Sequence, residues 1–299
     1  MITVFGSINM DLIANTERLP EPGETVAGTG FATAAGGKGA NQALAARRAG
    51  SFVCMVGAVG KDEFSKPALS LLNQAGVDLT AVDHVDGPTG TALILVGGTG
   101  ENMIAVVPAA NGTVNERQAR AAVAAMSAED VLMLQLEVPA AAVEAALQAA
   151  KAKGIRSILN TAPLTADAAR LVKLADVVIT NETEFELLTG QTDLRPNERE
   201  DLLRKMHAET GQTVIVTLGA EGVVAVQDGQ LFHAHGLDIQ PVDTVGAGDT
   251  FCGYLAAGID SGLTFAEALR RAAVAGSLAC LKPGAQPSIP LAEEVASRL

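Results

Sequence analysis

The chain has 299 residues, of which 48% are hydrophobic and 18% charged, and its formal net charge is −13. This composition favours a folded globular protein over a disordered chain. The acidic balance, without a basic stripe or tail, predicts no binding to nucleic acid and no binding to anionic membranes. No apolar run reaches the roughly 18 residues that a membrane-spanning helix needs. Three scattered cysteines without a CxxC pair indicate a reducing compartment, so we expect a cytoplasmic protein.

The first third of the chain reads mainly as short strands and glycine turns. Residues 1–8 form a β-rich run that is typical of a buried first strand. Residues 11–35 contain two short β-rich patches among prolines and glycines. Residues 36–50 are a glycine turn that runs into an alanine-rich helix, and residues 89–111 predict a hairpin around "GGTGEN".

From residue 115 onward, runs typical of helices and of buried strands alternate along the chain. Such alternation predicts right-handed βαβ units on a mostly parallel sheet. The early β patches do not fit this alternation, so we expect them to form a small separate β-element. No repeat, linker or second domain boundary is visible, and we therefore expect a single domain over residues 1–299.

Several common nucleotide and catalytic motifs are absent. "GGKGA" lacks the hydroxyl residue that follows the lysine of a P-loop, and no G-x-G-x-x-G or G-x-S-x-G is present. His233 and His235 alternate on one predicted strand without a neighbouring cysteine or carboxylate. We interpret this pair as surface residues and not as metal ligands.

The segment "DTVGAGDTFCGYLAAGI", residues 243–259, raises a chemical possibility. Glycines allow the backbone to approach a ligand closely, and free N–H groups at a helix start form an anion site. Asp249 could be a plain helix cap. It could equally accept a proton from a substrate hydroxyl while the amides stabilise a phosphoryl group, which would suit a kinase without a P-loop.

"DTVGAGDTFCG" closely resembles the C-terminal signature of the PfkB, or ribokinase, family of carbohydrate kinases, and "GGKGANQALA" resembles its N-terminal glycine signature. Smaller segments follow in the family's order across essentially the whole chain: "SINMD", "TGTALILV", "GENMI", "QLEVP", "NETE", "TLGAEG" and "KPGAQPS". The resemblance implies a ribokinase-like α/β fold of three layers, a mostly parallel sheet with helices on both faces. It also implies a β-sheet lid, formed here by about residues 12–35 and 89–108, which interlocks with a second lid in a homodimer.

The implied reaction is ATP-dependent phosphorylation of the primary hydroxyl of a small sugar, with D-ribose as the first choice. Asp249 would be the general base, and the amides of Gly246, Ala247 and Gly248 would hold the γ-phosphate. The implied sugar-binding set is Asn9, Asp11, Gly36, Gly37, Lys38, Asn41, Glu137 and Asp249. Without the resemblance, Asn9 to Asp11 could be a turn after the first strand, Lys38 a solvated side chain and Glu137 a structural carboxylate.

The resemblance also implies a nucleotide site and two cation sites. The implied nucleotide-binding residues are Asn181, Glu184, Thr217, Gly219, Gly222 and Gly248. Glu184 would organise Mg²⁺ through water, although Asn181 with the following acids could simply cap a helix. A monovalent cation, K⁺ as activator, would bind at Asp243, Val245, Ala279, Gly284 and Ser288.

Other functions remain open at this stage. A relative with another substrate could act on fructose, a 2-keto-3-deoxy sugar acid, deoxyribose or a nucleoside. A non-catalytic sugar sensor could use the same fold, but it would not need a base such as Asp249. A dehydrogenase is disfavoured because the dinucleotide fingerprint is missing.

Overall fold

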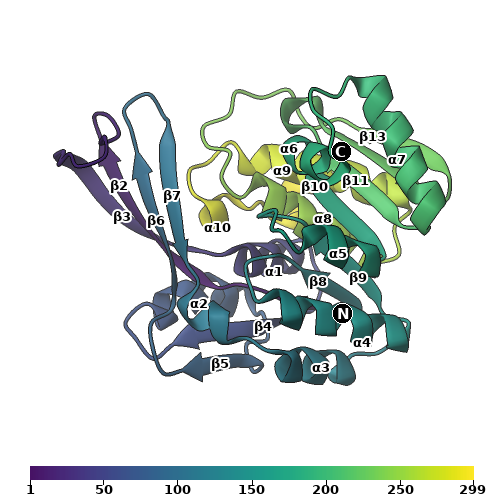
Figure 1. Ribbon diagram of the computed structural model, residues 1–299, viewed down its shortest axis with the longest axis horizontal. Helices are drawn as coiled ribbons and strands as arrows, with labels where there is room; N and C mark the ends of the chain where they lie inside the picture. The colour runs from purple at the N-terminus through teal and green to yellow at the C-terminus, as the bar shows by residue number, and fades with distance from the viewer.

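The computed structural model describes residues 1–299 and is built around a sheet of nine strands in the order β13-β12-β11-β10-β9-β8-β1-β4-β5 (Figure 1). The strands from β5 to β11 run parallel, and β12 and β13 form an antiparallel edge. The mostly parallel sheet predicted from the alternation is therefore confirmed. The strands are β1 (Ile2–Phe5), β4 (Val53–Gly60), β5 (Val82–Val85), β8 (Val131–Leu134), β9 (Arg156–Asn160), β10 (Val177–Asn181), β11 (Thr213–Thr217), β12 (Val223–Gln227) and β13 (Gln230–Ala234).

Helices cover both faces of this sheet, which confirms the three layers. One face packs against α1 (Lys38–Arg48), α2 (Ser65–Ala75), α8 (Ala247–Asp260) and α9 (Phe265–Ala279). The other packs against α3 (Glu116–Ala125), α4 (Ala140–Lys153), α5 (Ala168–Leu171), α6 (Glu182–Thr189) and α7 (Pro196–Thr210). Within β1, Val4 belongs to the first core and Phe5 to the second, because successive strand residues point to opposite faces.

The remaining helices are short. They are η1 (Ala109–Thr113), η2 (Val172–Leu174), η3 (Gly219–Glu221), α10 (Ala285–Ser288) and α11 (Ala292–Ala296). Across the structure, every helix is too short or too polar to cross a bilayer.

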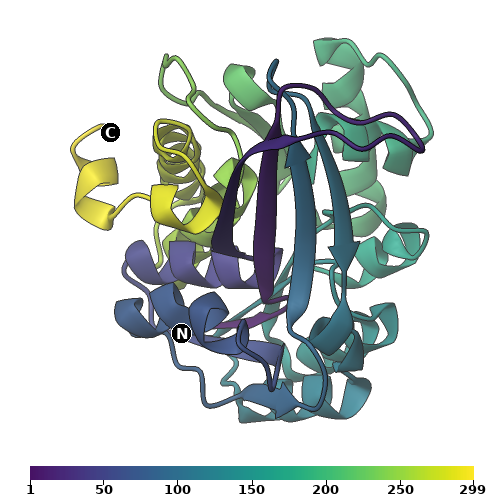
Figure 2. The same ribbon diagram turned by 90° about the vertical axis from the view of Figure 1, so that its left-hand side faces the viewer.

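A second, four-stranded sheet stands beside the main body in the order β3-β2-β6-β7 (Figures 1 and 2). Its strands are β2 (Asn9–Thr16), β3 (Gly28–Gly36), β6 (Gly90–Val96) and β7 (Asn102–Val107). We call this sheet the lid. The predicted hairpin is present, because β6 and β7 pair antiparallel. Asn9 to Asp11 lie in strand β2 and not in a turn. Of the two β-rich patches expected in residues 11–35, "GFATAA" lies in β3, whereas "ETVAG" precedes this strand except for its last residue, Gly28.

Asn111 fixes the base of the lid to the body. Its Oδ1 accepts a hydrogen bond from the Ile8 amide at 2.9 Å, and its Nδ2 donates to the Ile8 carbonyl at 3.1 Å and to Asn9 Oδ1 at 2.7 Å. Asn111 is 1% exposed, so these bonds do not compete with water. The chain therefore leaves β1 and enters the lid through a firmly held segment.

The close packing of α1 against α8 positions the residues of the two glycine signatures. Gly253 in α8 allows this approach, since a Cβ added there would lie 2.5 Å from Ala45 Cβ and 2.6 Å from the Gln42 carbonyl oxygen of α1. Both distances are too short for real contacts, so the two helices touch at this point through a glycine.

We predict that Gly253→Ala forces α1 and α8 apart. Overpacking of this kind costs about 1–3 kcal/mol of unfolding free energy, which chemical denaturation would measure. Gly112→Ala is the matched control, because its added Cβ would have no neighbour closer than 3.6 Å. An equal loss of stability in both variants would contradict the importance of this contact.

Candidate active site

The predicted site residues lie at the carboxyl ends of the parallel strands, where open α/β sheets place their ligands. Asn181 ends β10, Thr217 ends β11, and Glu137 follows β8 by three residues. Lys38 and Asp249 stand in the first turns of α1 and α8. The fold thus brings residues from both glycine signatures to one edge of the sheet.

Asp249 is a buried carboxylate, 7% exposed, held by two side-chain amides of α1. Asn41 Nδ2 donates to its Oδ2 at 2.9 Å, and Gln42 Nε2 donates to its Oδ1 at 3.0 Å. It does not cap its own helix, because the N-cap residue is Gly246 and no side chain caps the helix start. The structure therefore disfavours the plain helix-cap interpretation of Asp249.

The start of α8 presents unpaired backbone donors beside this carboxylate. Gly246 has φ 78°, and a Cβ there would lie 2.9 Å from Ala285, so a glycine is required. The amide of Ala247 donates to the Thr244 carbonyl at 3.3 Å, whereas the amides of Gly248 and Asp249 have no backbone acceptor. Space is open next to Gly248. Free donors with the positive end of a helix suit an anion such as a phosphate.

Asn9 and Asp11 lie on the same face of β2, at the base of the lid, and their cross-strand partners in β3 are Gly36 and Ala34. A Cβ at Gly36 would overlap the Asp11 carboxylate, so the glycine makes room for it. Burial, followed by the nearby carboxylates of Glu137 and Asp249, raises the pKa of Asp11 to about 6. The surroundings of Asp11 thus disfavour its ionised form.

Lys38 and Glu137 meet at the start of α1. Glu137 Oε2 accepts hydrogen bonds from Ser7 Oγ at 2.5 Å and from the Lys38 backbone amide at 3.0 Å. The Asp249 carboxylate, followed by those of Glu137 and Glu184, raises the pKa of the Lys38 ammonium, against the opposing effect of burial. The Lys38 side chain is therefore a cation directed into a cluster of carboxylates.

Asn181 and Glu184 form a capping box at the start of α6. Asn181 Oδ1 accepts from the Glu184 amide at 2.8 Å, and Glu184 Oε2 accepts from the Asn181 amide at 3.1 Å and from Thr161 Oγ1 at 2.9 Å. The helix-cap interpretation is thus correct as a description of the contacts. It leaves Glu184 Oε1 without a hydrogen bond inside the chain, so a ligand role remains compatible with the cap.

The turn after β11 exposes backbone by means of glycines. Gly219 and Gly222 have φ 56° and 97°, in the left-handed region that favours glycine. A Cβ at Gly222 would also overlap the backbone of Ala234. Thr217 Oγ1 donates to the Thr180 carbonyl at 3.4 Å, which ties this turn to the end of β10.

The five residues predicted to bind a monovalent cation come from two loops that touch. Asp243 Oδ1 accepts from the Val245 amide at 3.0 Å, and its Oδ2 accepts from the Gly284 amide at 2.8 Å. Ala279 ends α9, and Ser288 ends α10, where its Oγ donates to the Ala285 carbonyl at 2.8 Å. Through Ala285, this loop pair also contacts Gly246 at the start of α8.

Three side-chain amides that were not predicted from the sequence support the site. Gln42, Gln135 and Asn160 are linked to Asp249 by side-chain hydrogen bonds. A signal for them exists in the sequence: Gln42 interrupts an alanine-rich helix, and Gln135 interrupts the apolar run "VLMLQLEV". Polar residues inside buried elements need partners, so each of them pointed to a network.

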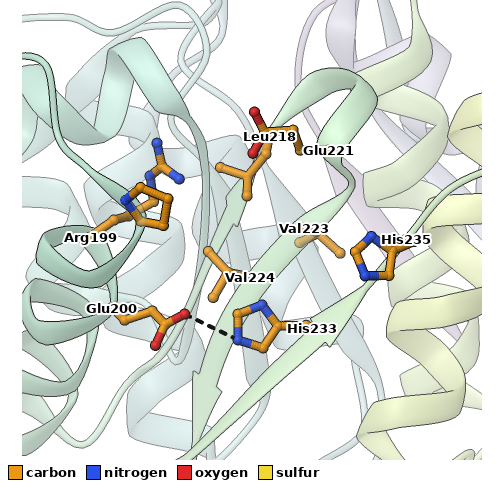
Figure 3. Close-up of a pocket in the computed structure, with 9 residues that line it drawn as sticks. Arg199, Glu200, Leu218, Glu221, Val223, Val224, His233 and His235 are labelled. Carbon is orange, nitrogen blue, oxygen red and sulfur yellow. Dashed lines mark ion pairs between the residues drawn. The ribbon is translucent and has the colours of Figure 1, made fainter.

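His233 and His235 line a cavity of about 290 Å³ between α7, η3 and the β12–β13 edge (Figure 3). His233 Nε2 lies 3.4 Å from Glu200 Oε1, and the His233 side chain is half exposed. No group of three His, Cys, Asp or Glu side chains in the structure could hold a metal ion. The interpretation of this pair as surface residues agrees with their exposure.

The fold and the site together define a sugar kinase that lacks a P-loop. The chain belongs to the pfkB family of carbohydrate kinases, whose sequence pattern matches residues 1–292. It is 37% identical to a ribokinase of Haemophilus influenzae over 98% of this chain and 96% of that one. It is 32% identical to a deoxyribokinase of Salmonella typhi, with the same two coverages. An Arabidopsis thaliana ribokinase structure, complexed with ribose and ATP, superimposes with a TM-score of 0.88 at 32% identity, covering 99% of this chain and 97% of that one.

Asp11→Asn should stabilise the protein at neutral pH. The raised pKa means that the folded state binds the Asp11 proton more tightly than the unfolded state, so stability falls as pH rises from about 4 to about 6. Removing the charge should increase the unfolding free energy by up to about 3 kcal/mol at about pH 8, and by roughly half of that at about pH 5.

Urea denaturation at the two pH values measures this difference. The exposed Asp228→Asn is the control and should change little at either pH. A gain from Asp11→Asn that does not depend on pH would show that burial and the neighbouring carboxylates do not raise the pKa of Asp11.

Proposed function

We propose that the protein transfers the γ-phosphate of ATP to the primary hydroxyl of D-ribose, giving D-ribose 5-phosphate and ADP. The observation that carries this proposal is the buried Asp249 carboxylate beside the unpaired amides of α8. Relatives named ribokinase, with 33–37% identity over nearly the full chain, support ribose as the acceptor. The ligands printed for the Arabidopsis structure support ribose and ATP together.

Asp249 acts as the general base in this mechanism. The proton of the sugar hydroxyl passes to its carboxylate as the hydroxyl oxygen forms a bond to the γ-phosphorus and the bond to the ADP oxygen breaks. The amides of Gly246, Ala247 and Gly248 would face the charge that develops on the transferred group. Of these, the Gly248 amide has no backbone acceptor, whereas the Ala247 amide would share its hydrogen with the Thr244 carbonyl. Lys38 adds a positive charge from the neighbouring helix start, which compensates for the carboxylates around it.

The sugar is held by hydrogen-bonding side chains from the lid base and α1. We propose Asn9, Asp11 and Glu137 as acceptors and donors for its hydroxyl groups, with Asn41 between sugar and base. Asn41 Oδ1 is buried and has no partner within the chain, so it is free to accept from a ligand. Gly36 and Gly37 leave the space that the sugar fills.

Asn181, Glu184, Thr217, Gly219 and Gly222, with Gly248, form the proposed nucleotide site. Mg²⁺ fits this site because Glu184 keeps one carboxylate oxygen free, and because Mg²⁺ is usually held by substrate phosphates and water more than by protein. When bound, Mg²⁺ neutralises charge on the phosphate groups. The chain would orient the phosphate groups, and the Glu184 carboxylate would contact the ion through water.

Asp243 and the loop residues Val245, Ala279, Gly284 and Ser288 are the proposed K⁺ site. One carboxylate with several backbone carbonyls suits a large monovalent cation better than a small divalent one. Its contact with Gly246 through Ala285 links the ion to the anion-binding amides. We propose that K⁺ activates the enzyme by ordering the start of α8.

The lid, about residues 12–35 and 89–108, is proposed to close over the sugar and to pair with the lid of a second chain. Both faces of the lid expose large apolar side chains: Ile104 and Val106 lie on the Asp11 face, and Phe31, Leu93, Met103 and Val107 lie on the other. A sheet with two exposed apolar faces is unusual for a monomer. Closure of the lid would exclude water from the reacting phosphate.

Deoxyribose is the nearest rival substrate because the Salmonella deoxyribokinase is 32% identical over the same span. Fructose, a 2-keto-3-deoxy sugar acid and a nucleoside remain further alternatives. A non-catalytic sensor would need no general base, so it would not explain why Asn41 and Gln42 hold Asp249 in place. All three cysteines are free thiols, in keeping with the cytoplasm, where ATP is available.

Asp249→Asn should abolish phosphorylation while the protein stays folded and still binds ribose. Loss of a general base lowers kcat by roughly 10²–10⁴-fold. ADP release would be measured with Mg-ATP and K⁺ for D-ribose, 2-deoxyribose, D-fructose, 2-keto-3-deoxygluconate and adenosine. Activity confined to another sugar would keep the mechanism and overturn ribose, whereas an active Asp249→Asn would overturn the base.

K⁺ should raise the activity well above that in Na⁺ at equal ionic strength. Asp243→Asn should remove most of this difference, because it replaces the only carboxylate among the proposed cation ligands with a neutral amide. Initial rates in the two chloride salts test this, with Asp228→Asn as the control. Equal rates of the unaltered enzyme in Na⁺ and K⁺ would rule out the activation.

The protein should be a dimer at micromolar concentration. Charged residues placed on the lid, as in Leu93→Lys together with Met103→Lys, should produce a monomer because they oppose burial of the apolar face. Light scattering after size exclusion would measure both masses. A monomeric unaltered protein would contradict pairing through the lid.

A further inference from the structure

A chain of side-chain amides ends at the Asp249 carboxylate. Gln42 Nε2 donates to Asp249 Oδ1 at 3.0 Å and to Asn160 Oδ1 at 3.2 Å. Gln42 Oε1 accepts from Gln135 Nε2 at 2.7 Å. Gln42 and Gln135 are both 0% exposed, so the whole Gln42 amide is satisfied by protein atoms and by no solvent.

A backbone carbonyl fixes the direction of these hydrogen bonds. Asn160 Nδ2 donates to the Ile179 carbonyl in β10 at 3.2 Å, so Asn160 Oδ1 faces Gln42. Only an amide nitrogen can meet both Asn160 Oδ1 and the Asp249 carboxylate. A flipped Gln42 would place its oxygen against two acceptors and its nitrogen against the Gln135 nitrogen, which leaves buried groups unpaired.

We propose that Gln42 is a positioning residue for the general base, and that Asn160 and Gln135 hold Gln42 in the required orientation. Gln42 binds Asp249 Oδ1 on the enclosed side and leaves Oδ2, beside Asn41, for the sugar hydroxyl. The proposal rests on the proposed role of Asp249. Because Gln42 and Gln135 are enclosed by protein, they act on the reaction through Asp249.

The expected consequence is a loss of rate rather than of sugar affinity. A carboxylate held at only one oxygen can rotate, and a misplacement of about 1 Å at a reacting group can cost roughly 10²-fold in rate. Asn9 and Glu137 are held by hydrogen bonds to residues other than Gln42, so KM for ribose should change much less than kcat.

The first test compares Gln42→Met and Gln42→Glu in the full chain, with Mg-ATP and D-ribose over a range of pH. Gln42→Met keeps the shape but loses the donor, and kcat should fall roughly 10- to 100-fold. Gln42→Glu places a second carboxylate against Asp249, and two carboxylates at this distance resist being ionised together. The acidic limb of the plot of log kcat against pH should therefore move to higher pH.

The second test leaves Gln42 in place and changes its two other hydrogen-bond partners. Gln135→Met and Asn160→Leu each remove one group that orients Gln42 and should lower kcat less than Gln42→Met does. They keep the proposal testable if Gln42→Met does not fold. Gln212→Met is the matched control, since Gln212 is a buried amide that donates to the Val172 and Ala175 carbonyls outside the site. It should lower the melting temperature and leave the pH profile of kcat unchanged.

Two results would overturn the proposal: a folded Gln42→Met enzyme with the kcat of the unaltered protein, or a Gln42→Glu enzyme whose acidic limb stays in place. A loss of melting temperature in Gln42→Met that matches Gln212→Met, with kcat unchanged, would show a structural role alone. Failure of the proposed function is distinguishable. In that case the unaltered protein does not phosphorylate ribose, or Asp249→Asn retains activity, whatever the Gln42 variants do.

Discussion

The arrangement of the site depends on how closely α1 and α8 approach one another. Both helices begin at a glycine with positive φ, Gly37 at 89° and Gly246 at 78°, and both bring their N-terminal ends to the same edge of the sheet. Gly253 lets the two backbones meet without an intervening side chain. As a result Asn41 and Gln42, which are 208 and 207 residues away from Asp249 in the sequence, reach its carboxylate directly.

The site combines positive and negative groups within an acidic chain. The protein has a formal net charge of −13, yet its proposed substrate ATP is an anion. Two helix starts and Lys38 supply the positive potential, and three carboxylates, those of Asp11, Glu137 and Asp249, lie close enough to disturb one another. Such crowding lowers the stability of the free protein, and it is the kind of cost that proteins accept at sites built for function.

Much of the fold was predictable because its physical causes are local. Alternating helix and strand patterns predicted the parallel sheet, and the glycine signatures indicated the two helix starts that the fold brings together in the candidate site. Strand β2 was harder to predict, because Asn9 and Asp11 are polar residues in a strand whose pairing partners lie far along the chain. The Gln42 network was hidden for the same reason: its members come from α1, the residue after β8, β9 and α8, and only the tertiary structure brings their side chains together.

The hydrogen bonds from Asn111 to Ile8 and Asn9 form a clamp that holds the first residue of β2 in place. A tilt of the strand would therefore pivot at this end. The strand rises about 3.3 Å per residue, so its far end at Thr16 lies about 23 Å from the clamp and Asp11 only about 7 Å from it. A tilt of about 5° would therefore move the far end by about 2 Å and Asp11 by about 0.6 Å, given these lengths. The geometry gives large travel at the end where a second chain is proposed to pair and small travel at the proposed sugar site. A tilt of the strand would therefore move its far end while Asp11 stays nearly in place.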